Sequence, residues 1–352
     1  MGVDLRHGGN REAVAVRLNC PPSQLLDASA SLVPWSPRWQ RIGLSAWRDY
    51  PDRSQALLRQ RLVALHSLEP SFVLPGNGAA ELFTWAARDA AEQGLSVLPA
   101  PGFADYGRAL RCWYGASREQ QLPLVWDEAF PQSFPEPGVG SVLWICNPHN
   151  PTGQLWSRAS LQPLLNRYAL VICDEAFLPL VPNGEQQSLI PFVAEHSNLV
   201  VIRSLTKLLA IAGLRLGYAV AAPERLQRWQ QWRDPWPVNG LALAAGQAVM
   251  ADQAGMDRWL QRVHAWVTHE GSWFHQQLDD LPGFSPLPSS ANYQLLRGEV
   301  SLLDLRERVA RQRVLLRDCR SFAGLGENWL RIGLQDRRGN RRILKALKKE
   351  LS

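Results

Sequence analysis

The sequence predicts an α/β fold in which a large domain with a mostly parallel sheet precedes a smaller α+β domain. Short apolar runs at 142–146, 169–173 and 199–202 are typical of strands that are buried on both faces. These strands alternate with helical stretches, as connections between parallel strands require. From about Ala222 this alternation gives way to long amphipathic helices and then to a mixed pattern, which indicates a second unit.

The other elements follow from the same patterns. Residues 1–40 are irregular apart from a short helix, and their small-residue stretch at 25–31 cannot form a core of its own. The glycine turn Gly76-Asn77-Gly78 opens a strongly helical run. We predict helices at about 11–18, 54–66, 79–93, 241–252, 256–278 and 302–312, and a last helix from about Asn340. We predict strands at 95–98, 142–146, 169–173, 199–202, 291–296, 314–317 and 329–334.

Three segments organise the chain. Residues 1–40 are expected to pack on the small domain and the active site. Residues 41–238 form the large, ligand-binding domain, and residues 239–352 form the small C-terminal domain. The proline-rich and Asn-Gly sequences around 234–240 mark the boundary between the two domains.

Composition excludes several classes of protein. Of the 352 residues, 46% are hydrophobic and 20% charged, as in a globular protein of two domains. Five cysteines without a CxxC pair predict neither a disulfide framework nor a zinc or other metal site, and they favour the reducing cytoplasm. No apolar run reaches membrane-spanning length and the N-terminus has no signal-peptide core, so we expect a soluble cytoplasmic protein with no membrane partner.

The net charge of +6 invites a nucleic-acid-binding interpretation. Only the segment from Arg337 to Lys349 is densely basic, and a solvated C-terminal helix accounts for it, because cations are favourable near a helix C-terminus. No DNA-reading module precedes the fold, so we expect no nucleic-acid partner. A non-catalytic protein of this fold, or a nucleic-acid binder, is the alternative outside the enzyme class.

Polar side chains follow three predicted strands. Asn150 lies in a double Asn-Pro turn, Asp174 comes directly after an apolar run, and Lys207 follows the next strand. Open α/β sheets bind ligands at the carboxyl ends of their strands. A buried carboxylate needs a cation or a donor, and a desolvated lysine has a lowered pKa and can form a Schiff base. We therefore expect an acid, an amide and an amine to converge; a surface lysine beside a helix start is the alternative for Lys207 alone.

Other residues are candidates for holding an anionic or flat ligand. The N–H groups at the helix start formed by Gly78, Ala79 and Ala80 can bind a phosphate, although glycine-rich helix starts are common. Arg215 can return to the same crevice. Phe103 follows a Pro-Gly turn, where it can stack on a ligand or simply pack under the next helix with Tyr106.

Together these motifs resemble the fold-type I pyridoxal-phosphate aminotransferases. The resemblance covers essentially the whole chain and rests on four motifs in order, namely Asn150-Pro151-Thr152-Gly153, Asp174-Glu175-Ala176, Ser204-x-Thr206-Lys207, and Arg215 with Gly217-Tyr218. It implies an aspartate-aminotransferase-like fold and pyridoxal 5'-phosphate as the cofactor. It also implies a homodimer, in which Tyr50 reaches the phosphate of the other subunit's cofactor.

The resemblance implies a role for each site residue. Lys207 forms the Schiff base with the cofactor, Asp174 pairs with the protonated pyridine nitrogen, and Asn150 hydrogen-bonds the phenolic oxygen. The ring of Phe103 stacks on the cofactor ring. The cofactor phosphate is held by Ser204, Arg215 and the N–H groups of Gly78, Ala79 and Ala80. Arg331 meets the substrate carboxylate, because its planar fork suits a carboxylate.

A finer resemblance is to the threonine-phosphate decarboxylase branch, which makes the aminopropanol phosphate linker of cobalamin. It rests on His7-Gly8-Gly9-Asn10, on residues 26–30 and 75–81, and on Leu316-Arg317-Asp318-Cys319. It implies decarboxylation of L-threonine O-3-phosphate to (R)-1-amino-2-propanol phosphate, with His7 as our candidate for the substrate phosphate. The alternative is a histidinol-phosphate aminotransferase or a similar aminotransferase, which shares the general motifs.

The chain departs from these patterns at three positions. Phe177 stands where aminotransferases of this kind usually carry tyrosine. Ser31 and Val33 stand where the decarboxylase branch usually carries asparagines. The first departure removes a hydroxyl near the expected cofactor, and the other two remove amides near the expected substrate pocket.

Overall fold

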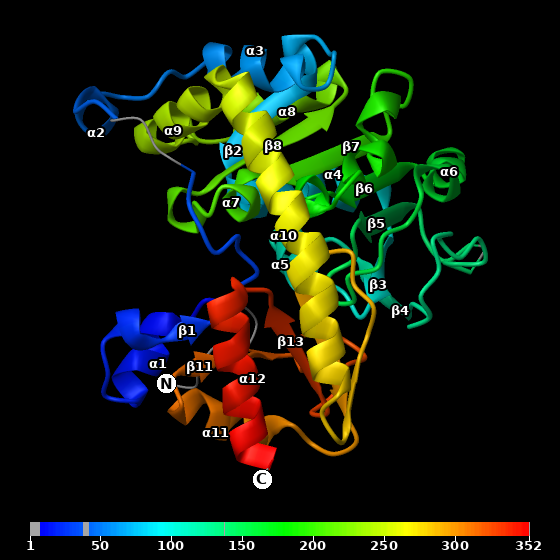
Figure 1. The fold of residues 1–352 in the computed structure, drawn as a ribbon. Helices are drawn as coiled ribbons and strands as arrows, with labels where there is room; N and C mark the ends of the chain where they lie inside the picture. The colour runs from blue at the N-terminus through cyan, green and yellow to red at the C-terminus, as the bar shows by residue number, and fades with distance from the viewer. Residues whose placement is uncertain (1–7, 38–41, 137, 352) are drawn as a thin grey trace.

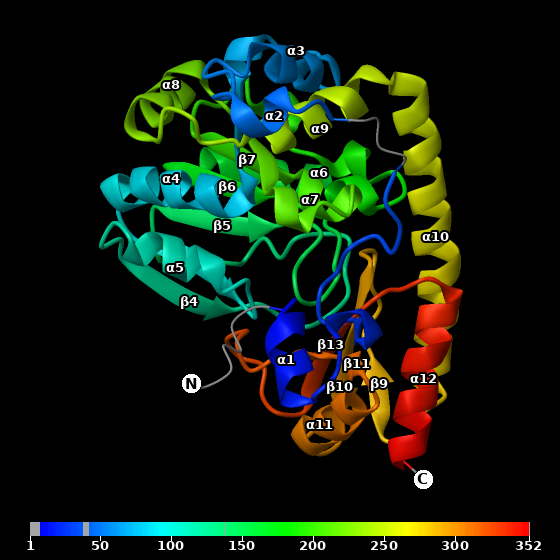
Figure 2. The same cartoon turned by 90° about the vertical axis from the view of Figure 1, so that its left-hand side faces the viewer.

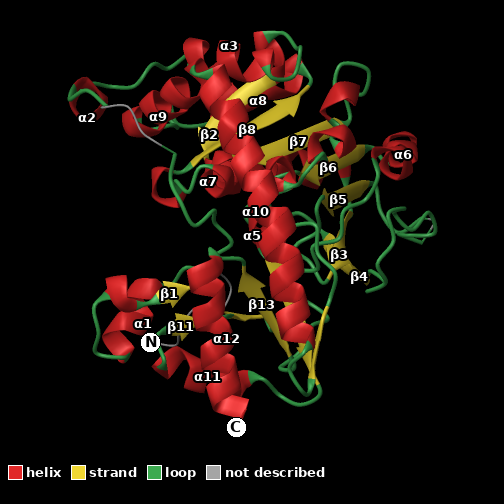
Figure 3. Ribbon diagram, in the orientation of Figure 1, coloured by secondary structure: helices red, strands yellow, loops and turns green. Residues whose placement is uncertain are grey.

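The computed structural model describes residues 8–37, 42–136 and 138–351. Its centre is a seven-stranded sheet, and a separate four-stranded antiparallel sheet lies towards the C-terminus (Figures 1 and 3). The large sheet has the spatial order β2 (Val73–Asn77), β8 (Leu216–Ala221), β7 (Leu199–Ser204), β6 (Leu170–Asp174), β5 (Val142–Cys146), β3 (Ser96–Ala100) and β4 (Ser117–Gln121). Strands β4, β3, β5, β6 and β7 are mutually parallel, whereas β8 is antiparallel to both of its neighbours. The predicted mostly parallel sheet is confirmed.

Helices cover both faces of the large sheet. In β5, Val142, Trp144 and Cys146 face one core, while Leu143 and Ile145 face the other, because successive side chains of a strand point to opposite faces. The helices α4 (Gly78–Gln93), α5 (Asp105–Arg111) and α8 (Pro223–Trp232) cover the first face. The helices α3 (Ala56–Ala64), α9 (Gly240–Ala251) and α10 (Gln253–Asp279) contribute to the second core. In Figure 2, α4, α5 and α8 lie on the left of the large domain and α10 lies on the right.

The four-stranded sheet has the order β12 (Arg317–Asp318), β13 (Trp329–Gly333), β10 (Tyr293–Gly298) and β9 (Phe284–Pro286). The helices α11 (Leu303–Arg311) and α12 (Arg337–Leu351) belong to the same region. The 27 residues of α10 run from beside the large sheet down to β9 (Figure 1). At about 1.5 Å per residue, this helix is about 40 Å long and joins the two regions.

The N-terminal segment packs against the C-terminal part of the chain. Helix α1 (Arg11–Arg17) leads to β1 (Leu26–Asp27), which pairs in parallel with β11 (Val314–Leu315). Apolar side chains of the segment, including Val14, contact apolar residues of the C-terminal region, including Ala310. The domain boundaries at residues 40 and 238 stay a prediction.

The structure differs from the prediction mainly at the edges of the sheets. Strands β2 and β4, the antiparallel β8 and the helix α8 were not predicted. Strand β2 contains Pro75, which is tolerated because β2 is an edge strand, and β4 is a polar strand on the other edge. The run at 314–317 was predicted as one strand, but it divides into β11 and β12, which pair with β1 and β13. The last helix begins at Arg337, three residues before the predicted Asn340.

The remaining helices are short. They are α2 (Ser45–Arg48), α6 (Arg158–Leu161) and α7 (Leu205–Leu208). Helix α7 begins directly after β7, at the edge where the predicted site residues lie.

A buried ion pair ties the ends of β6 and β7 together. Glu175, directly after β6, is 2.7 Å from the guanidinium of Arg203 on β7, and both side chains are almost fully buried. The Glu175 carboxylate also accepts hydrogen bonds from the Ser188 hydroxyl and the Leu189 N–H, each at 2.8 Å. Arg203 forms a second salt bridge with Glu185. The pair therefore holds the two strand ends and the 185–189 loop in one arrangement.

Replacing Arg203 by methionine is expected to lower the free energy of unfolding by about 3 kcal/mol or more, because the buried Glu175 carboxylate loses its cation. Urea unfolding of the purified protein measures this. The matched control is Arg308→Met, which removes ion pairs with Asp304 and Glu350 on the surface and should cost no more than about 1 kcal/mol. Equal losses in the two variants would show that the buried pair does not hold the strand ends.

Candidate active site

One cavity of about 330 Å³ collects most of the predicted site residues. It lies at the carboxyl ends of β5, β6 and β7, and residues of β12 and β13 form its opposite wall. The predicted residues that line it are Ala79, Ala80, Phe103, Asn150, Asp174, Ser204, Lys207, Arg215 and Arg331. Gly78 adjoins it at the start of α4, with Arg215 against it. As expected from the sequence, the strand ends bring Asp174, Asn150 and Lys207 to one cavity.

Lys207 lies on α7, whose backbone is held from two sides. The Val33 N–H donates to the Lys207 carbonyl at 3.3 Å, and the Trp259 indole N–H donates to the Leu208 carbonyl at 3.0 Å. Desolvation in the cavity lowers the pKa of the Lys207 ammonium to about 8, and the positive charges of Arg331 and Arg215 act in the same direction. A larger fraction of this amine is therefore neutral at neutral pH than in an ordinary lysine, and a neutral amine is a nucleophile.

Asp174 is the last residue of β6 and is buried at the cavity floor. One carboxylate oxygen accepts the Ala176 N–H at 2.9 Å, and the other accepts the Tyr106 hydroxyl at 2.7 Å. Burial raises the pKa of the carboxyl to about 6, although both hydrogen bonds and the charge of Lys207 lower it. A buried carboxylate calls for a cation, and no cationic side chain of the described residues forms a salt bridge with Asp174.

An anion-binding corner lies at the start of α4. Gly78 has a φ of +73°, and a Cβ there would come within 2.7 Å of the Arg215 guanidinium, so glycine is needed for the close approach. The Ser204 and Thr206 hydroxyls, 2.7 Å apart, lie at the cavity as well. The N-terminus of a helix of this length favours negative charge. Helix dipole, guanidinium and hydroxyls together suit a phosphate.

Two arginines stand side by side on the opposite wall. Arg317 of β12 is paired in register with Arg331 of β13, and both line the cavity. Arg331 donates to the Asn150 side-chain oxygen at 2.6 Å and to the Ser29 carbonyl at 3.2 Å, and Arg317 donates to the Ser321 hydroxyl at 2.6 Å. Burial and then the charge of Arg331 lower the pKa of Arg317 to about 10. Two adjacent buried guanidiniums favour a ligand with negative charge.

The N-terminal segment completes this wall. Gly8, Ser29 and Ser31 line the cavity, and a Cβ on Gly8 would come within 2.2 Å of the Ser29 carbonyl oxygen. Among the residues that the structure describes, the buried Ser31 hydroxyl has no hydrogen-bond partner, and neither has Nε of Arg331. These two groups can still bind a ligand. His7, the candidate for a substrate phosphate, lies outside the described residues.

Among the described residues, four phenylalanines line the cavity, including Phe103 and Phe177, whereas Tyr50 lies elsewhere. Phe103 lies edge-on to Phe83 and Tyr106, and Phe177 packs edge-on against Tyr293. The Phe177 ring centre is 5.9 Å from Nζ of Lys207 and offers no hydroxyl there. Tyr50 does not line the cavity: its side chain is 79% exposed and stacks on Trp236 at 4.3 Å.

Sequence reasoning missed two groups in or beside this cavity. Arg317 was noticed only as part of a motif and was given no role. Tyr106 was weighed as a packing residue, and its hydroxyl instead reaches Asp174. In the sequence, Arg317 and Tyr106 are marked only by their positions next to a predicted strand end or turn.

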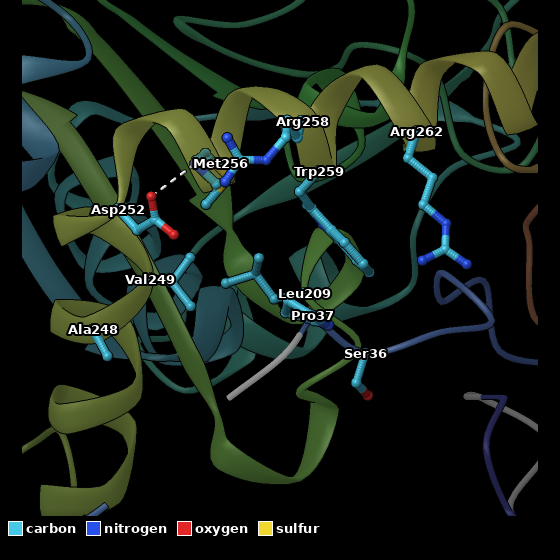
Figure 4. A pocket seen from close by; sticks show the side chains of 11 residues that line it. Ser36, Pro37, Leu209, Ala248, Val249, Asp252, Met256, Arg258, Trp259 and Arg262 are labelled. Carbon is cyan, nitrogen blue, oxygen red and sulfur yellow. Dashed lines mark hydrogen bonds between the residues drawn. The ribbon is translucent and has the colours of Figure 1, made fainter. Parts of the chain in front are cut away.

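Other cavities are as large but differ in chemistry. Figure 4 shows one of about 380 Å³ between Ser36–Pro37 and the junction of α9 and α10. Apolar residues such as Trp259 line it together with Arg258, Arg262 and Asp252, and the Asp252 carboxylate accepts the Gly255 N–H and caps α10. A cavity of about 490 Å³ lies beside α5, lined in part by Arg108 and Arg111. The residues next to Lys207 and Asp174, and not the volume, single out the candidate site.

Some features are absent from the part of the chain that the structure describes. No helix there is long and apolar enough to cross a membrane. No group of three or more His, Cys, Asp and Glu residues there could hold a metal ion. All five cysteines are free thiols.

Comparisons with known proteins agree with this geometry. The chain is 36% identical to the threonine-phosphate decarboxylase of Salmonella typhimurium, over 98% of this chain and 96% of the relative. It is 33% identical to the histidinol-phosphate aminotransferase of Symbiobacterium thermophilum, over 88% of this chain and 85% of the relative.

Solved structures share the fold. The L-threonine-O-3-phosphate decarboxylase of Porphyromonas gingivalis aligns with a TM-score of 0.76 at 24% identity, over 100% of this chain and 98% of that chain. The aspartate aminotransferase of Thermus thermophilus aligns with a TM-score of 0.79 at 17% identity, over 99% and 100%. The predicted aspartate-aminotransferase-like fold is confirmed. The family model "Aminotransferase class I and II" matches residues 44–347. The chain therefore belongs to the aminotransferase class I and II family.

Proposed function

We propose that the protein is a pyridoxal-phosphate-dependent decarboxylase that converts L-threonine O-3-phosphate to (R)-1-amino-2-propanol phosphate and CO2, for cobalamin biosynthesis. The observation that carries this proposal is the pair Arg317 and Arg331, which face the cavity that also holds Lys207 and Asp174. Two guanidiniums suit a substrate with two anionic groups, a carboxylate and a phosphate. The 36% identity to a threonine-phosphate decarboxylase supports the same substrate.

The residues of the cavity fit pyridoxal 5'-phosphate. Lys207 is the amine that attaches the cofactor, and the start of α4, Ser204 and Arg215 suit its phosphate. The buried Asp174 has a carboxylate to offer a protonated ring nitrogen, and Phe103 has an aromatic face for the ring. When bound, the cofactor supplies an electron sink for the electron pair left at the substrate's α carbon.

The orientation of Asn150 follows from its neighbour. Its side-chain oxygen accepts from Arg331, so its amide N–H2 is the end that remains for an acceptor. The phenolic oxygen of the cofactor is such an acceptor. Since Phe177 provides no hydroxyl, Asn150 is the donor that we assign to this oxygen. The missing hydroxyl also distinguishes this site from those of ordinary aminotransferases.

The other residues act on the substrate and its protons. Arg331 binds the carboxylate and Arg317 the phosphate, with the Ser31 hydroxyl and His7 as further candidates for polar contacts. These anion contacts would orient the substrate so that the bond to its carboxylate, and not another bond at the α carbon, is the one whose electron pair the cofactor accepts. After CO2 leaves, the ammonium of Lys207 is placed to return a proton to the α carbon.

We also propose a homodimer in which Tyr50 enters the partner's site. Leu44, Trp47 and Tyr50 are 86%, 71% and 79% exposed, and such a cluster of apolar side chains is typical of an interface. Tyr50 does not line the cavity of its own chain, which is consistent with a contribution to a second copy. The five free thiols are consistent with the cytoplasm, where we place the protein.

The first test supplies L-threonine O-3-phosphate to the purified protein with pyridoxal phosphate and without any keto acid. Steady release of CO2 and formation of aminopropanol phosphate are expected, with none from Lys207→Ala, because that variant lacks the attaching amine. Carbon dioxide release and product are measured together. Absence of CO2, with amino transfer between histidinol phosphate and a keto acid, would move the assignment to the aminotransferase that the 33% relative suggests.

Arg317→Gln is expected to raise KM for L-threonine O-3-phosphate by about 10- to 100-fold, because one charge-assisted contact to the phosphate is lost. Inhibition by L-threonine, which lacks the phosphate, should not change. The matched control is Arg311→Gln on the exposed surface of α11. If Arg317→Gln weakens both ligands equally, Arg317 does not bind the phosphate.

Co-expression of the Tyr50→Ala and Lys207→Ala chains tests the shared site. In a hybrid dimer, one site combines an intact Lys207 with the partner's intact Tyr50. Random pairing should then give about a quarter of the parental activity, more than either variant alone. If the mixture is no more active than the Tyr50→Ala dimers that it contains, Tyr50 does not act in the partner's site.

A further inference from the structure

A buried tyrosine has no part in the roles assigned above. Tyr106 is the second residue of α5, is 3% exposed, and donates its hydroxyl to Asp174 at 2.7 Å. The hydroxyl meets the carboxylate oxygen that the Ala176 N–H does not use. Each oxygen of Asp174 therefore has one donor from the protein.

The ring of Tyr106 has little freedom to move. It stacks on Trp144, with 5.0 Å between ring centres and 29° between planes. Phe83 and Phe103 lie edge-on to it at 5.2 and 5.7 Å. Rings packed in this way fix both the position and the direction of the hydroxyl.

The hydroxyl also stays protonated. Burial, and then the charge of Asp174, raise the pKa of Tyr106 well above its ordinary value. The group is thus a donor at any pH at which the protein works. A fixed donor favours the ionised form of a carboxylate, which accepts the hydrogen bond, over the protonated form.

We propose that Tyr106 is a positioning residue, which holds the Asp174 carboxylate ionised and correctly oriented for a proton on the cofactor's ring nitrogen. This inference rests on the proposed cofactor site, in which Asp174 faces that nitrogen. Tyr106 itself touches neither the ring nitrogen nor the substrate in this assignment, so it acts only through Asp174.

The test compares two cofactors and two variants. Tyr106→Phe keeps the ring on Trp144 and removes only the hydroxyl. Dissociation constants are measured by equilibrium dialysis for pyridoxal phosphate and for its carbocyclic analogue, in which C–H replaces the ring nitrogen. The matched control is Tyr218→Phe, which removes a buried tyrosine hydroxyl from the same sheet, where it bonds to His66 at 2.9 Å.

Tyr106→Phe is expected to weaken binding of pyridoxal phosphate by about tenfold, the effect of one hydrogen bond to a charged group. Binding of the carbocyclic analogue should change by less than about twofold, because it offers Asp174 no proton. Tyr218→Phe should leave the ratio of the two affinities as in the parent. Since each variant is compared with itself, partial misfolding lowers both affinities and leaves the ratio unchanged.

Two results would overturn the inference. If Tyr106→Phe weakens both cofactors equally, or weakens neither, Tyr106 only packs beside the site. If the parent itself binds the two cofactors equally, Asp174 does not face the ring nitrogen. Equal binding by the parent would contradict both the proposed orientation of the cofactor and this inference. The results with Tyr106→Phe would contradict this inference alone.

Discussion

The consecutive carboxylates Asp174 and Glu175 set the constraint on which the site depends. Asp174 ends the buried strand β6 and Glu175 follows it, and burial raises the pKa of both. Glu175 turns into the protein and receives a cation from Arg203, which binds the ends of β6 and β7 together. Asp174 lines the cavity, and its hydrogen-bond donors among the described residues are two neutral groups, the Tyr106 hydroxyl and the Ala176 N–H. One carboxylate is thus satisfied by the fold, and its neighbour is left for a cationic ligand.

The sequence predicted those features that depend on nearest neighbours in the chain. The inner strands β5, β6 and β7 were found within a residue or two, and with them Asp174 and Lys207, because buried strands are apolar along their whole length. Edge strands such as β2 lack that pattern. The approach of Arg317 to Arg331 depends on the register of antiparallel strands, which composition does not reveal. Likewise, Tyr106 and Asp174 are 68 residues apart, and only the packing of α5 brings them together.

The two ends of the chain build the substrate side of the cavity together. The Gly9 N–H donates to the Ser29 hydroxyl, and the Gly333 N–H donates to the Ala28 carbonyl. Arg331 in turn donates to the Ser29 carbonyl. The large sheet supplies the residues suited to the cofactor, while the chain termini supply those suited to the substrate. Substrate preference can therefore change through residues such as Ser31 without disturbing Lys207 or Asp174.

The neighbouring guanidiniums of Arg317 and Arg331 also bear on product release in the proposed reaction. Like charges this close repel one another in a partly desolvated site, and a ligand with two anionic groups relieves both. Loss of the carboxylate as neutral CO2 leaves the ligand with its phosphate alone. In the proposed assignment Arg331 then loses the carboxylate that it binds, so the product would be held less firmly than the substrate. If Arg317 and Arg331 bind the substrate as proposed, the same pair promotes departure of the product and turnover of the enzyme.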